Sequence, residues 1–352
     1  MSNTLDLSPA AYAGSPDAVP LLQVNGLAVD YLTTEGPVRA CADVDLTVRR
    51  GEIIGIAGES ASGKSTLLTA LTRLQRPPAV TAAGSIIYQP PEGAPVDLAA
   101  LTERQLSPLR WQDISIVMQS AMACLNPVTT IGAQFRDVLR RHNPGMSKAA
   151  TTERAAQLLR LVGIPADRIR SYPHQMSGGM RQRTLIALAL ACEPELVVMD
   201  EPTTAVDVVT QRHILDQIIR LQEQLGFAVV FVTHDLSLLI EISDRIAIMY
   251  GGRIVELGSA QQIFESPLHP YTRGLRNAYP PLTAPLRRLT GIPGTPPDLR
   301  ALPAGCAFAP RCAHRMDVCD LERPKLLPAG DGVAACHLHP APAAMSSTGE
   351  GS

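Results

Sequence analysis

The chain has 352 residues, of which 45% are hydrophobic and 18% are charged, and its 31 Lys and Arg residues nearly balance 33 Asp and Glu residues. This apolar content excludes a disordered or collagen-like chain, and the length provides one large or two modest domains with ample core. A formal net charge of −2 provides no general attraction to nucleic acid.

The amino-terminal segment lacks the basic region of a secretory signal, because the first basic residue is Arg39. The sequence also lacks an unbroken run of about eighteen apolar residues, the length that spans a membrane. We therefore expect a soluble cytosolic protein. In that compartment thiols stay reduced, so a cluster of cysteines more often indicates metal binding or chemistry than disulfides.

Composition separates a long central part from a proline-rich end. Residues 1–19 and 340–352 show no hydrophobic periodicity and are predicted to be disordered tails. Of the 30 prolines, 14 fall at or after Pro267, which disfavours long helices there. We predict a domain over residues 20–262 and a loop-rich extension over residues 263–339.

Short apolar runs alternate with helical patterns through the central part. Strands are expected at 22–31, 53–57, 114–118, 196–199, 228–232 and 246–250, and helices at 65–74, 152–161, 180–191 and 210–225. Strands separated by helices predict a mostly parallel sheet. Residues 32–50 and 84–98 have the pattern of short antiparallel strands. The predicted fold is therefore α/β, with an antiparallel β subdomain and a helical subdomain at about 120–185.

The segment Gly58–Thr66 follows an apolar run and matches G-x-x-x-x-G-K-[ST] between a strand and a helix. Gly58 and Gly63 let the backbone N–H groups turn inward around an anion, and the helix that follows directs its positive end at phosphate. Lys64 would neutralise β and γ oxygens, and the Ser65 hydroxyl can ligate Mg²⁺. The predicted nucleotide-binding residues of this loop are Gly58, Ser60, Gly63, Lys64, Ser65 and Thr66.

A second Mg²⁺ contact is expected from a carboxylate at a strand end. Asp200 and Glu201 directly follow the apolar run 196–199. We place Asp200 beside the metal and predict that Glu201 is the base that polarises the attacking water. Kinases, GTPases and motor ATPases share these two features, so the class of nucleotide enzyme depends on other residues.

Another glycine-containing segment lies 23 residues before Asp200. Ser177, Gly178 and Gly179 open an apolar helix, which is again an anion-binding geometry. One nucleotide does not need two such cradles from one chain. The economical explanation is a head-to-tail dimer, in which the Ser-Gly-Gly segment of each chain closes on the ATP held by its partner.

With these motifs, the sequence resembles the ATP-binding subunits of ABC transporters over residues 20–262, and Ser177–Gln182 is similar to their signature motif. The resemblance implies that Tyr31 stacks on adenine and that Gln119 approaches Mg²⁺ and senses the membrane subunit. It also implies that His234 contacts the γ-phosphate as a catalytic residue. The residues implied to contact the partner's nucleotide are Ser177, Gly178, Gly179, Gln182 and, in the D-loop, Asp207.

Four positions depart from the usual pattern of that family. Ala61 stands where the phosphate loop often has Gly, and we expect it to keep φ below zero. Val206 replaces a frequent Leu in the D-loop, a modest change of volume. Ser120 and Ala121 replace a frequent Asp-Pro after Gln119, which bears on coupling to the membrane subunit and leaves the phosphate and metal contacts in place.

The extension resembles the C-terminal region of dipeptide and oligopeptide importer ATPases, on the residues His269-Pro270-Tyr271-Thr272 and the step from Cys306 to Arg311-Cys312. This resemblance implies ATP hydrolysis that powers peptide import. It also implies a second, different ABC ATPase as partner in a heterodimer, two membrane permease subunits and an extracytoplasmic binding protein. The chain would then lie at the cytoplasmic face of the membrane.

Four of the seven cysteines crowd into the last 47 residues. Cys306, Cys312, Cys319 and Cys336 lack the close pairs typical of zinc sites. The resemblance implies that they hold a [4Fe–4S] cluster. Zinc, with His314 or His337 as a further ligand, is the alternative, and unliganded or disulfide-linked cysteines are another. Cys41, Cys124 and Cys192 are predicted to serve only packing.

Two other functions remain open at this point. Importers of nickel and other small solutes share parts of the extension pattern. A soluble ABC ATPase acting on nucleic acid or ribosomes is less favoured, because the sequence shows neither a second nucleotide domain nor a basic stripe.

Overall fold

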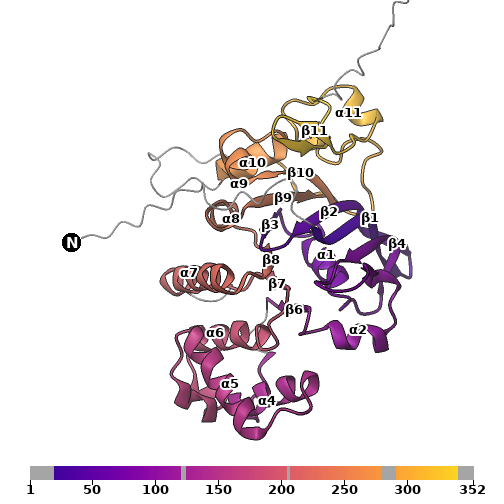
Figure 1. The fold of residues 1–352 in the computed structure, drawn as a ribbon. Helices are drawn as coiled ribbons and strands as arrows, with labels where there is room; N and C mark the ends of the chain where they lie inside the picture. The colour runs from indigo at the N-terminus through magenta and orange to yellow at the C-terminus, as the bar shows by residue number, and fades with distance from the viewer. Residues whose placement is uncertain (1–19, 120–123, 204–206, 279–290, 340–352) are drawn as a thin grey trace, which may run out of the picture.

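The computed structural model describes residues 20–119, 124–203, 207–278 and 291–339 (Figure 1). The expected tails at 1–19 and 340–352, and the departures at Ser120, Ala121 and Val206, lie outside the described residues.

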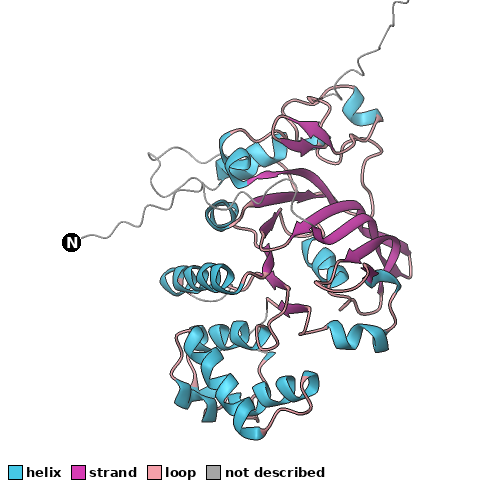
Figure 2. Ribbon diagram, viewed as in Figure 1, coloured by secondary structure: helices cyan, strands magenta, loops and turns pink. Residues whose placement is uncertain are grey.

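The helices and strands follow one another along the chain largely as expected (Figure 2). The strands are β1 (Pro20–Thr33), β2 (Gly36–Arg49), β3 (Ile53–Ala57), β4 (Ala79–Tyr88), β5 (Val96–Asp97), β6 (Ile114–Val117), β7 (Leu196–Asp200), β8 (Ala228–Val232), β9 (Arg245–Tyr250), β10 (Arg253–Ser259), β11 (Leu327–Ala329) and β12 (Gly332–Ala334). The α-helices are α1 (Lys64–Leu71), α2 (Glu103–Leu109), α4 (Ile131–His142), α5 (Lys148–Leu161), α6 (Gly178–Ala189), α7 (Val208–Leu225), α8 (Leu236–Ile242), α9 (Ala260–Glu265), α10 (Pro270–Ala278) and α11 (Val318–Leu321).

The strands form two sheets. In the larger sheet, β9, β3, β8, β7 and β6 lie parallel in that order, which confirms the predicted parallel sheet. The smaller sheet has the order β2-β1-β4-β5 and is antiparallel, which confirms the predicted β subdomain. The strand expected to begin at 84 begins instead at Ala79, because the pairing with β1 continues to the pair Tyr31 and Ala79.

The core has two layers, one on each face of the larger sheet. Alternate residues of β7 belong to different hydrophobic clusters: Val197 and Met199 pack in one, and Leu196 and Val198 in the other. All four side chains are fully buried. A strand covered on both faces reads as an unbroken apolar run, and for this reason the parallel strands are recognisable in the sequence.

The predicted helical subdomain contains α4, α5 and α6, which lie together at one end of the molecule (Figure 1). Helix α5 begins at Lys148, four residues before the expected start, because the Ser147 side chain caps it by accepting from the N–H of Ala150. Helix α4 was not expected. Its buried Ile131, Phe135 and Leu139 recur every four residues, a spacing that indicates an amphipathic helix.

The extension lies at the opposite end from the helical subdomain (Figure 1). Its strands β11 and β12 join the larger sheet, because β12 pairs antiparallel with β10 through Glu256 and Ala334. The boundary near residue 262 stays a prediction. The sheet nevertheless continues across it, so the two parts share backbone hydrogen bonds.

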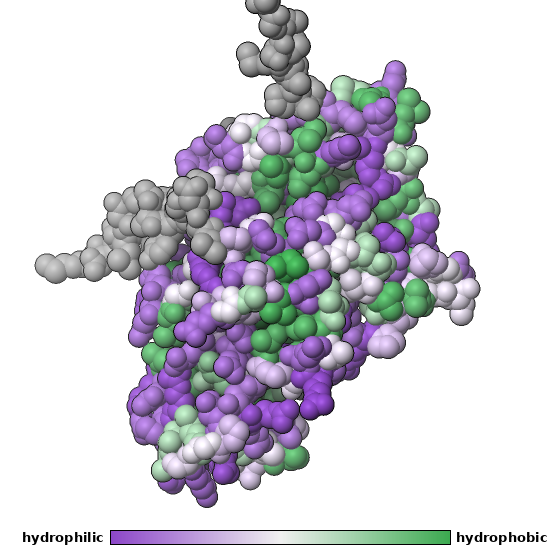
Figure 3. All heavy atoms as spheres, turned by 45° about the vertical axis from the view of Figure 1, so that its right-hand side comes forward, coloured by the Kyte–Doolittle hydropathy of each residue, from purple (hydrophilic) through white to green (hydrophobic). Residues whose placement is uncertain are grey.

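One face of the molecule is hydrophilic over its lower part, and hydrophobic side chains gather in its middle and upper part (Figure 3). Within the described ranges, the helices are too short or too polar to cross a membrane.

Candidate active site

The phosphate loop joins β3 to α1, as predicted. A Cβ atom at Gly58 would lie 2.3 Å from the carbonyl oxygen of Met249, and one at Gly63 would lie 2.5 Å from that of Ala40. Both residues also have positive φ, 153° and 102°. Only glycine fits at these two positions, so the loop is built around them.

Ala61 does not keep φ below zero, and that expectation was wrong. Its φ is 62°, in the left-handed region. The loop turns too tightly between its two glycines to leave the residue in the ordinary helical region. Holding an alanine there costs about 1 kcal/mol, so the loop stores a small strain.

Lys64 lies at the start of α1 with its ammonium buried inside the loop. Its Nζ donates to the carbonyl oxygens of Gly58 (2.6 Å) and Glu59 (2.8 Å) and to the Ser62 hydroxyl (3.4 Å). Burial lowers the pKa of Lys64, and the carboxylates of Glu201, Asp200 and Glu59 oppose that effect. The loop therefore holds one cation with oxygen acceptors on several sides, and phosphate oxygens are acceptors of the same kind.

Asp200 ends β7 and accepts a hydrogen bond from Ser65. Burial raises the pKa of Asp200, the bond from Ser65 lowers it, and the charge of Glu201 raises it further. The two predicted magnesium ligands are thus in contact. An aspartate and a hydroxyl oxygen form a donor set that suits Mg²⁺, so the residues present fit that ion.

Glu201 lies between two other predicted site residues. Its Oε2 accepts from the Nε2 of Gln119 at 2.8 Å, and its Oε1 lies 3.0 Å from the Nδ1 of His234. Its backbone N–H donates to Val232 at the end of β8. Glu201 also has a φ of 44°, an unusual conformation that accompanies functional sites.

Tyr31, on β1, reaches the same loop. Its hydroxyl lies 3.2 Å from the Oγ1 of Thr66 in α1, so the structure brings these two predicted nucleotide-binding residues together. The predicted residue Ser60 lies in the loop between Gly58 and Gly63.

The Ser-Gly-Gly segment opens α6, as predicted. The Ser177 side chain caps the helix by accepting from the N–H of Met180, and Gly179 approaches α7 so closely that a Cβ would lie 2.8 Å from Thr210. Gln182 is 3% exposed, and its Nε2 has no hydrogen-bond partner among the described residues. Asp207 caps α7, because its Oδ1 accepts from the N–H of Thr210 at 3.0 Å.

The segment Ser177–Gln182 lies away from the phosphate loop of its own chain. Figure 1 places α6 among the helices α4 and α5, whereas α1 lies beside β1 and β2. The single chain therefore contains two separate sets of predicted nucleotide-binding residues.

Comparison with known proteins identifies the family. Residues 41–204 match the family model described as ABC transporter, and residues 255–319 match the model described as oligopeptide/dipeptide transporter, C-terminal region. The chain belongs to the ABC transporter family. Its two matched regions correspond to the two resemblances seen in the sequence.

The relatives cover nearly the whole chain. It is 40% identical over 321 residues to a dipeptide transport ATP-binding protein of Caldanaerobacter subterraneus, a match that covers 91% of this chain and 97% of the relative. It is 42% identical over 318 residues to the oligopeptide transport ATP-binding protein of Salmonella typhimurium, covering 90% and 93%. A solved dimeric ATP-binding cassette with bound ADP and phosphate has a TM-score of 0.60 and 28% identity, covering 68% of this chain and 98% of that one. The predicted fold class is confirmed.

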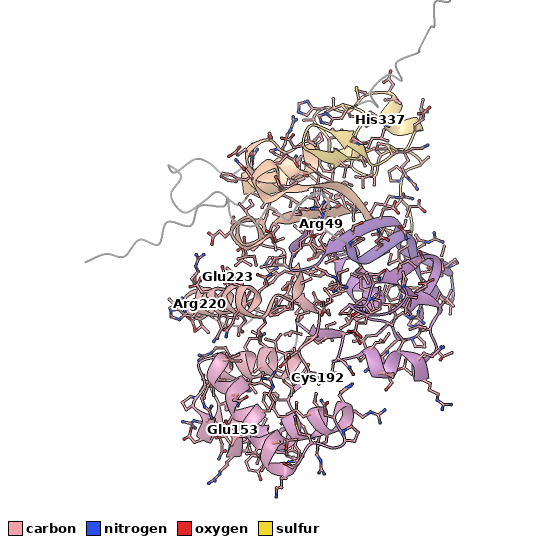
Figure 4. The ribbon with its side chains drawn as sticks, in the orientation of Figure 1. Arg49, Glu153, Cys192, Arg220, Glu223 and His337 are labelled. Atoms are coloured by element: carbon pink, nitrogen blue, oxygen red, sulfur yellow. The ribbon has the colours of Figure 1, made fainter. Side chains whose placement is uncertain are left out.

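The four cysteines of the extension converge on one place. Cys306, Cys312, Cys319 and Cys336 line a single small cavity of about 10 Å³, together with the histidines His269, His314 and His337. This space is roughly that of one water molecule. Figure 4 shows His337 in the extension, whereas Cys192 lies near the helical subdomain, far from this cavity.

The geometry of this cysteine pocket does not form a metal site. Among the described residues, no group of three or more His, Cys, Asp or Glu side chains is spaced to hold a metal ion. Cys306, Cys312, Cys319 and Cys336 form no disulfide, which contradicts the disulfide alternative. Burial raises the pKa of Cys306 to about 11 and also raises the pKa values of Cys312 and Cys336, so these thiols are protonated at neutral pH. The spacing of these side chains therefore does not support the iron–sulfur and zinc predictions, which rest on the resemblance and on the convergence of four cysteines on one cavity.

Several residues that lie against the phosphate loop were not predicted from the sequence. The N–H of Glu59 donates to the hydroxyl of Tyr271 at 2.8 Å, and the Glu59 carboxylate pairs with Arg311. Buried Glu256 accepts from the N–H groups of Leu268 and His269 and so fixes the segment before Tyr271. Nothing in the spacing of these residues relates them to the loop, because they lie about 200 or more positions away.

Proposed function

We propose that this chain is the ATP-hydrolysing subunit of an ABC importer and that it powers the uptake of dipeptides and oligopeptides. The observation that carries hydrolysis is the position of Glu201, which lies between Gln119 and His234 beside the contact of Ser65 with Asp200. The peptide substrate is supported by the extension matched over residues 255–319 and by relatives named for dipeptide and oligopeptide transport.

The residues of the phosphate loop would bind the triphosphate. Lys64 and the loop N–H groups would hold its oxygens, with Gly58, Ser60, Gly63 and Thr66 shaping the cradle and Tyr31 contacting the base. Mg²⁺, when bound, would neutralise charge on the phosphate oxygens. The residues that would hold it are Ser65, Asp200 and, more loosely, Gln119.

Glu201 would orient the attacking water and accept its proton, because its carboxylate directly follows Asp200 at the strand end and is held between Gln119 and His234. His234 would contact the γ-phosphate and hold Glu201 in place through its Nδ1. Because Gln119 contacts Glu201, a displacement of Gln119 by the membrane subunit would change the position of the base.

We infer a head-to-tail dimer in which the second chain completes the site with its Ser177, Gly178, Gly179, Gln182 and Asp207. The separation of α6 from α1 supports this arrangement (Figure 1). Val208 and Val209 follow Asp207 and are 78% and 65% exposed, so this surface offers apolar side chains for a partner to cover. The expected partners are a different ABC ATPase, two membrane permease subunits and an extracytoplasmic binding protein, with this chain peripheral at the cytoplasmic face.

The experiment is reconstitution of the importer in lipid vesicles with ATP enclosed. Dipeptide or oligopeptide supplied outside with the binding protein should stimulate phosphate release and accumulate inside the vesicle in proportion to hydrolysis. Vesicles carrying Glu201→Gln are the matched control. Stimulation by nickel or another small solute, with none by peptides, would contradict the substrate and favour the alternative importer class.

We also propose that the cysteine pocket takes a [4Fe–4S] cluster, supported by the convergence of Cys306, Cys312, Cys319 and Cys336 on one cavity. The pocket must open and lose its thiol protons to admit the cluster. Anaerobically purified protein should be brown and contain about four irons per chain, and Cys336→Ser should lose both. A colourless protein that contains stoichiometric zinc would contradict the cluster and favour zinc, with His314 or His337 as a ligand.

A further inference from the structure

An ion pair joins the extension to the phosphate loop. The guanidinium of Arg311 contacts the carboxylate of Glu59 with two parallel hydrogen bonds, Nη1 to Oε2 at 2.6 Å and Nη2 to Oε1 at 3.0 Å. The two residues are 252 positions apart in the sequence. The Arg311 side chain is only 6% exposed and that of Glu59 is 25% exposed, so water screens this pair poorly.

Arg311 is fixed on its other sides as well. Its Nε donates to the carbonyl of Pro293 at 2.7 Å, and its Nη1 lies 3.3 Å from the hydroxyl of Tyr250. Its guanidinium carbon lies 5.8 Å from the centre of the Tyr250 ring and 5.9 Å from that of Phe308. These contacts hold the charge in one place, directed at the loop.

Glu59 is the second residue of the phosphate loop, and its carbonyl accepts from Lys64 at 2.8 Å. Without Arg311, a carboxylate of low exposure would lie beside a loop that receives a polyanion. Its charge would repel phosphate and compete for the Lys64 ammonium. The pair with Arg311 cancels that charge.

We propose that Arg311 is a positioning residue for nucleotide binding, which neutralises Glu59 and leaves Lys64 to the phosphates. The inference rests on the proposed nucleotide site and extends it into the extension, which therefore contributes to ATP affinity through charge. Arg311 does not touch the nucleotide in this scheme, so its effect falls on binding more than on the chemical step.

The test is a double-mutant cycle on the full chain, with Kd for a fluorescent ATP analogue, KM and kcat measured for each variant at matched iron content. Arg311→Met should raise Kd and KM about tenfold, equivalent to about 1.4 kcal/mol, and change kcat by less than about threefold. Adding Glu59→Gln should restore Kd to within about threefold of the wild type, because the repelling charge is gone. If Arg311 served only packing, removing the charge of Glu59 would not restore ATP affinity.

Arg315→Met is the matched control. Arg315 lies in the same part of the extension but pairs with Asp320 and is 53% exposed, so its loss should leave Kd unchanged. Unchanged Kd in a folded Arg311→Met variant, or a double variant as weak as the single one, would overturn the proposal. Failure of the wild type itself to bind ATP would instead overturn the proposed function.

Arg311→Met leaves a carboxylate without its partner and can lower stability. Thermal unfolding of each variant measures this loss of stability separately from the change in ATP affinity. If the single variant does not fold, the double variant, which carries neither charge, becomes the test. It should bind ATP within about threefold of the wild type, and a tenfold loss there would show that packing by Arg311, and not its charge, serves the loop.

Discussion

Glu201 and His234 follow neighbouring parallel strands, β7 and β8, and meet at 3.0 Å although they are 33 residues apart in the sequence. The register of the two strands places Asp200 opposite Val232, so the residues that follow each strand emerge at the same edge of the sheet. Glu201 then turns its side chain toward His234 from a backbone with positive φ. The contact is thus produced by the sheet, and it defines the carboxylate on which hydrolysis is predicted to depend.

Glu201→Gln should retain ATP binding and lose turnover. The amide keeps the size of the side chain and its contacts with Gln119 and His234, but it cannot accept a proton from water. General-base catalysis contributes about 10²- to 10⁴-fold, so phosphate release should fall by that order. Phosphate release in a single turnover and binding of a fluorescent ATP analogue would measure the two effects separately. Hydrolysis at the wild-type rate would show that Glu201 is not the base.

Lys64→Ala should weaken nucleotide binding itself. The change removes the one buried cation of the loop, and Kd for Mg·ATP should rise about 10- to 100-fold. Titration calorimetry measures this directly. Lys148→Ala is a suitable control, because Lys148 is exposed at the start of α5. Equal affinities in the two variants would exclude Lys64 from phosphate binding.

Ala61→Gly should cost no stability, in contrast to the same change in a helix. Glycine relieves the strain of φ 62° but gains freedom in the unfolded chain, and the two effects nearly cancel. Ala150→Gly, on the exposed face of α5, should lose about 1 kcal/mol. Urea unfolding at neutral pH compares the two. A loss at Ala61 as large as that at Ala150 would mean that the loop is not strained there.

Asp244 should make stability depend on pH in a defined window. Burial raises its pKa from 3.8 to about 6, an effect opposed by the N–H of Ile53, which donates to it at 2.8 Å. Below about pH 4 the carboxyl of Asp244 is protonated in both the folded and the unfolded protein, and stability is highest. As the pH rises from about 4 to 6, the carboxyl ionises more readily in the unfolded protein, so stability is lost until the folded protein also ionises. Between about pH 4 and 6, this group should therefore lower stability by up to about 1.4 kcal/mol per pH unit.

Asp244→Asn isolates this contribution, because the amide still accepts from Ile53 but has no proton to lose. The stability of the variant relative to the wild type should grow from about pH 4 to 6 and then stay constant. Asp331→Asn, on the exposed turn between β11 and β12, is the control for the change from carboxylate to amide itself. Urea unfolding across this pH range gives both curves. A constant difference between Asp244→Asn and wild type would contradict the raised pKa.

Much of the fold was predictable from residue patterns. The parallel strands appear as continuous apolar runs because both faces of the sheet are covered, and the loop at Gly58–Thr66 is recognisable because only glycine fits at two of its positions. Helix α4 was missed although Phe135 and its neighbours at four-residue spacing indicated it. Ala61 was misjudged because the φ of a residue in a tight loop depends on how both ends of the loop are held.

The sequence by itself determined the chemistry of this protein: the loop that turns around an anion, the acidic residues at a strand end and the helix opened by Ser177. These are local patterns, set by residues close together along the chain. Only the tertiary structure decided which distant side chains meet. The contacts of Glu201 with Gln119 and of Glu59 with Arg311, and the convergence of the four cysteines on one cavity, come from strand order and packing. Such proximity depends on distance in space and leaves no trace in residue spacing.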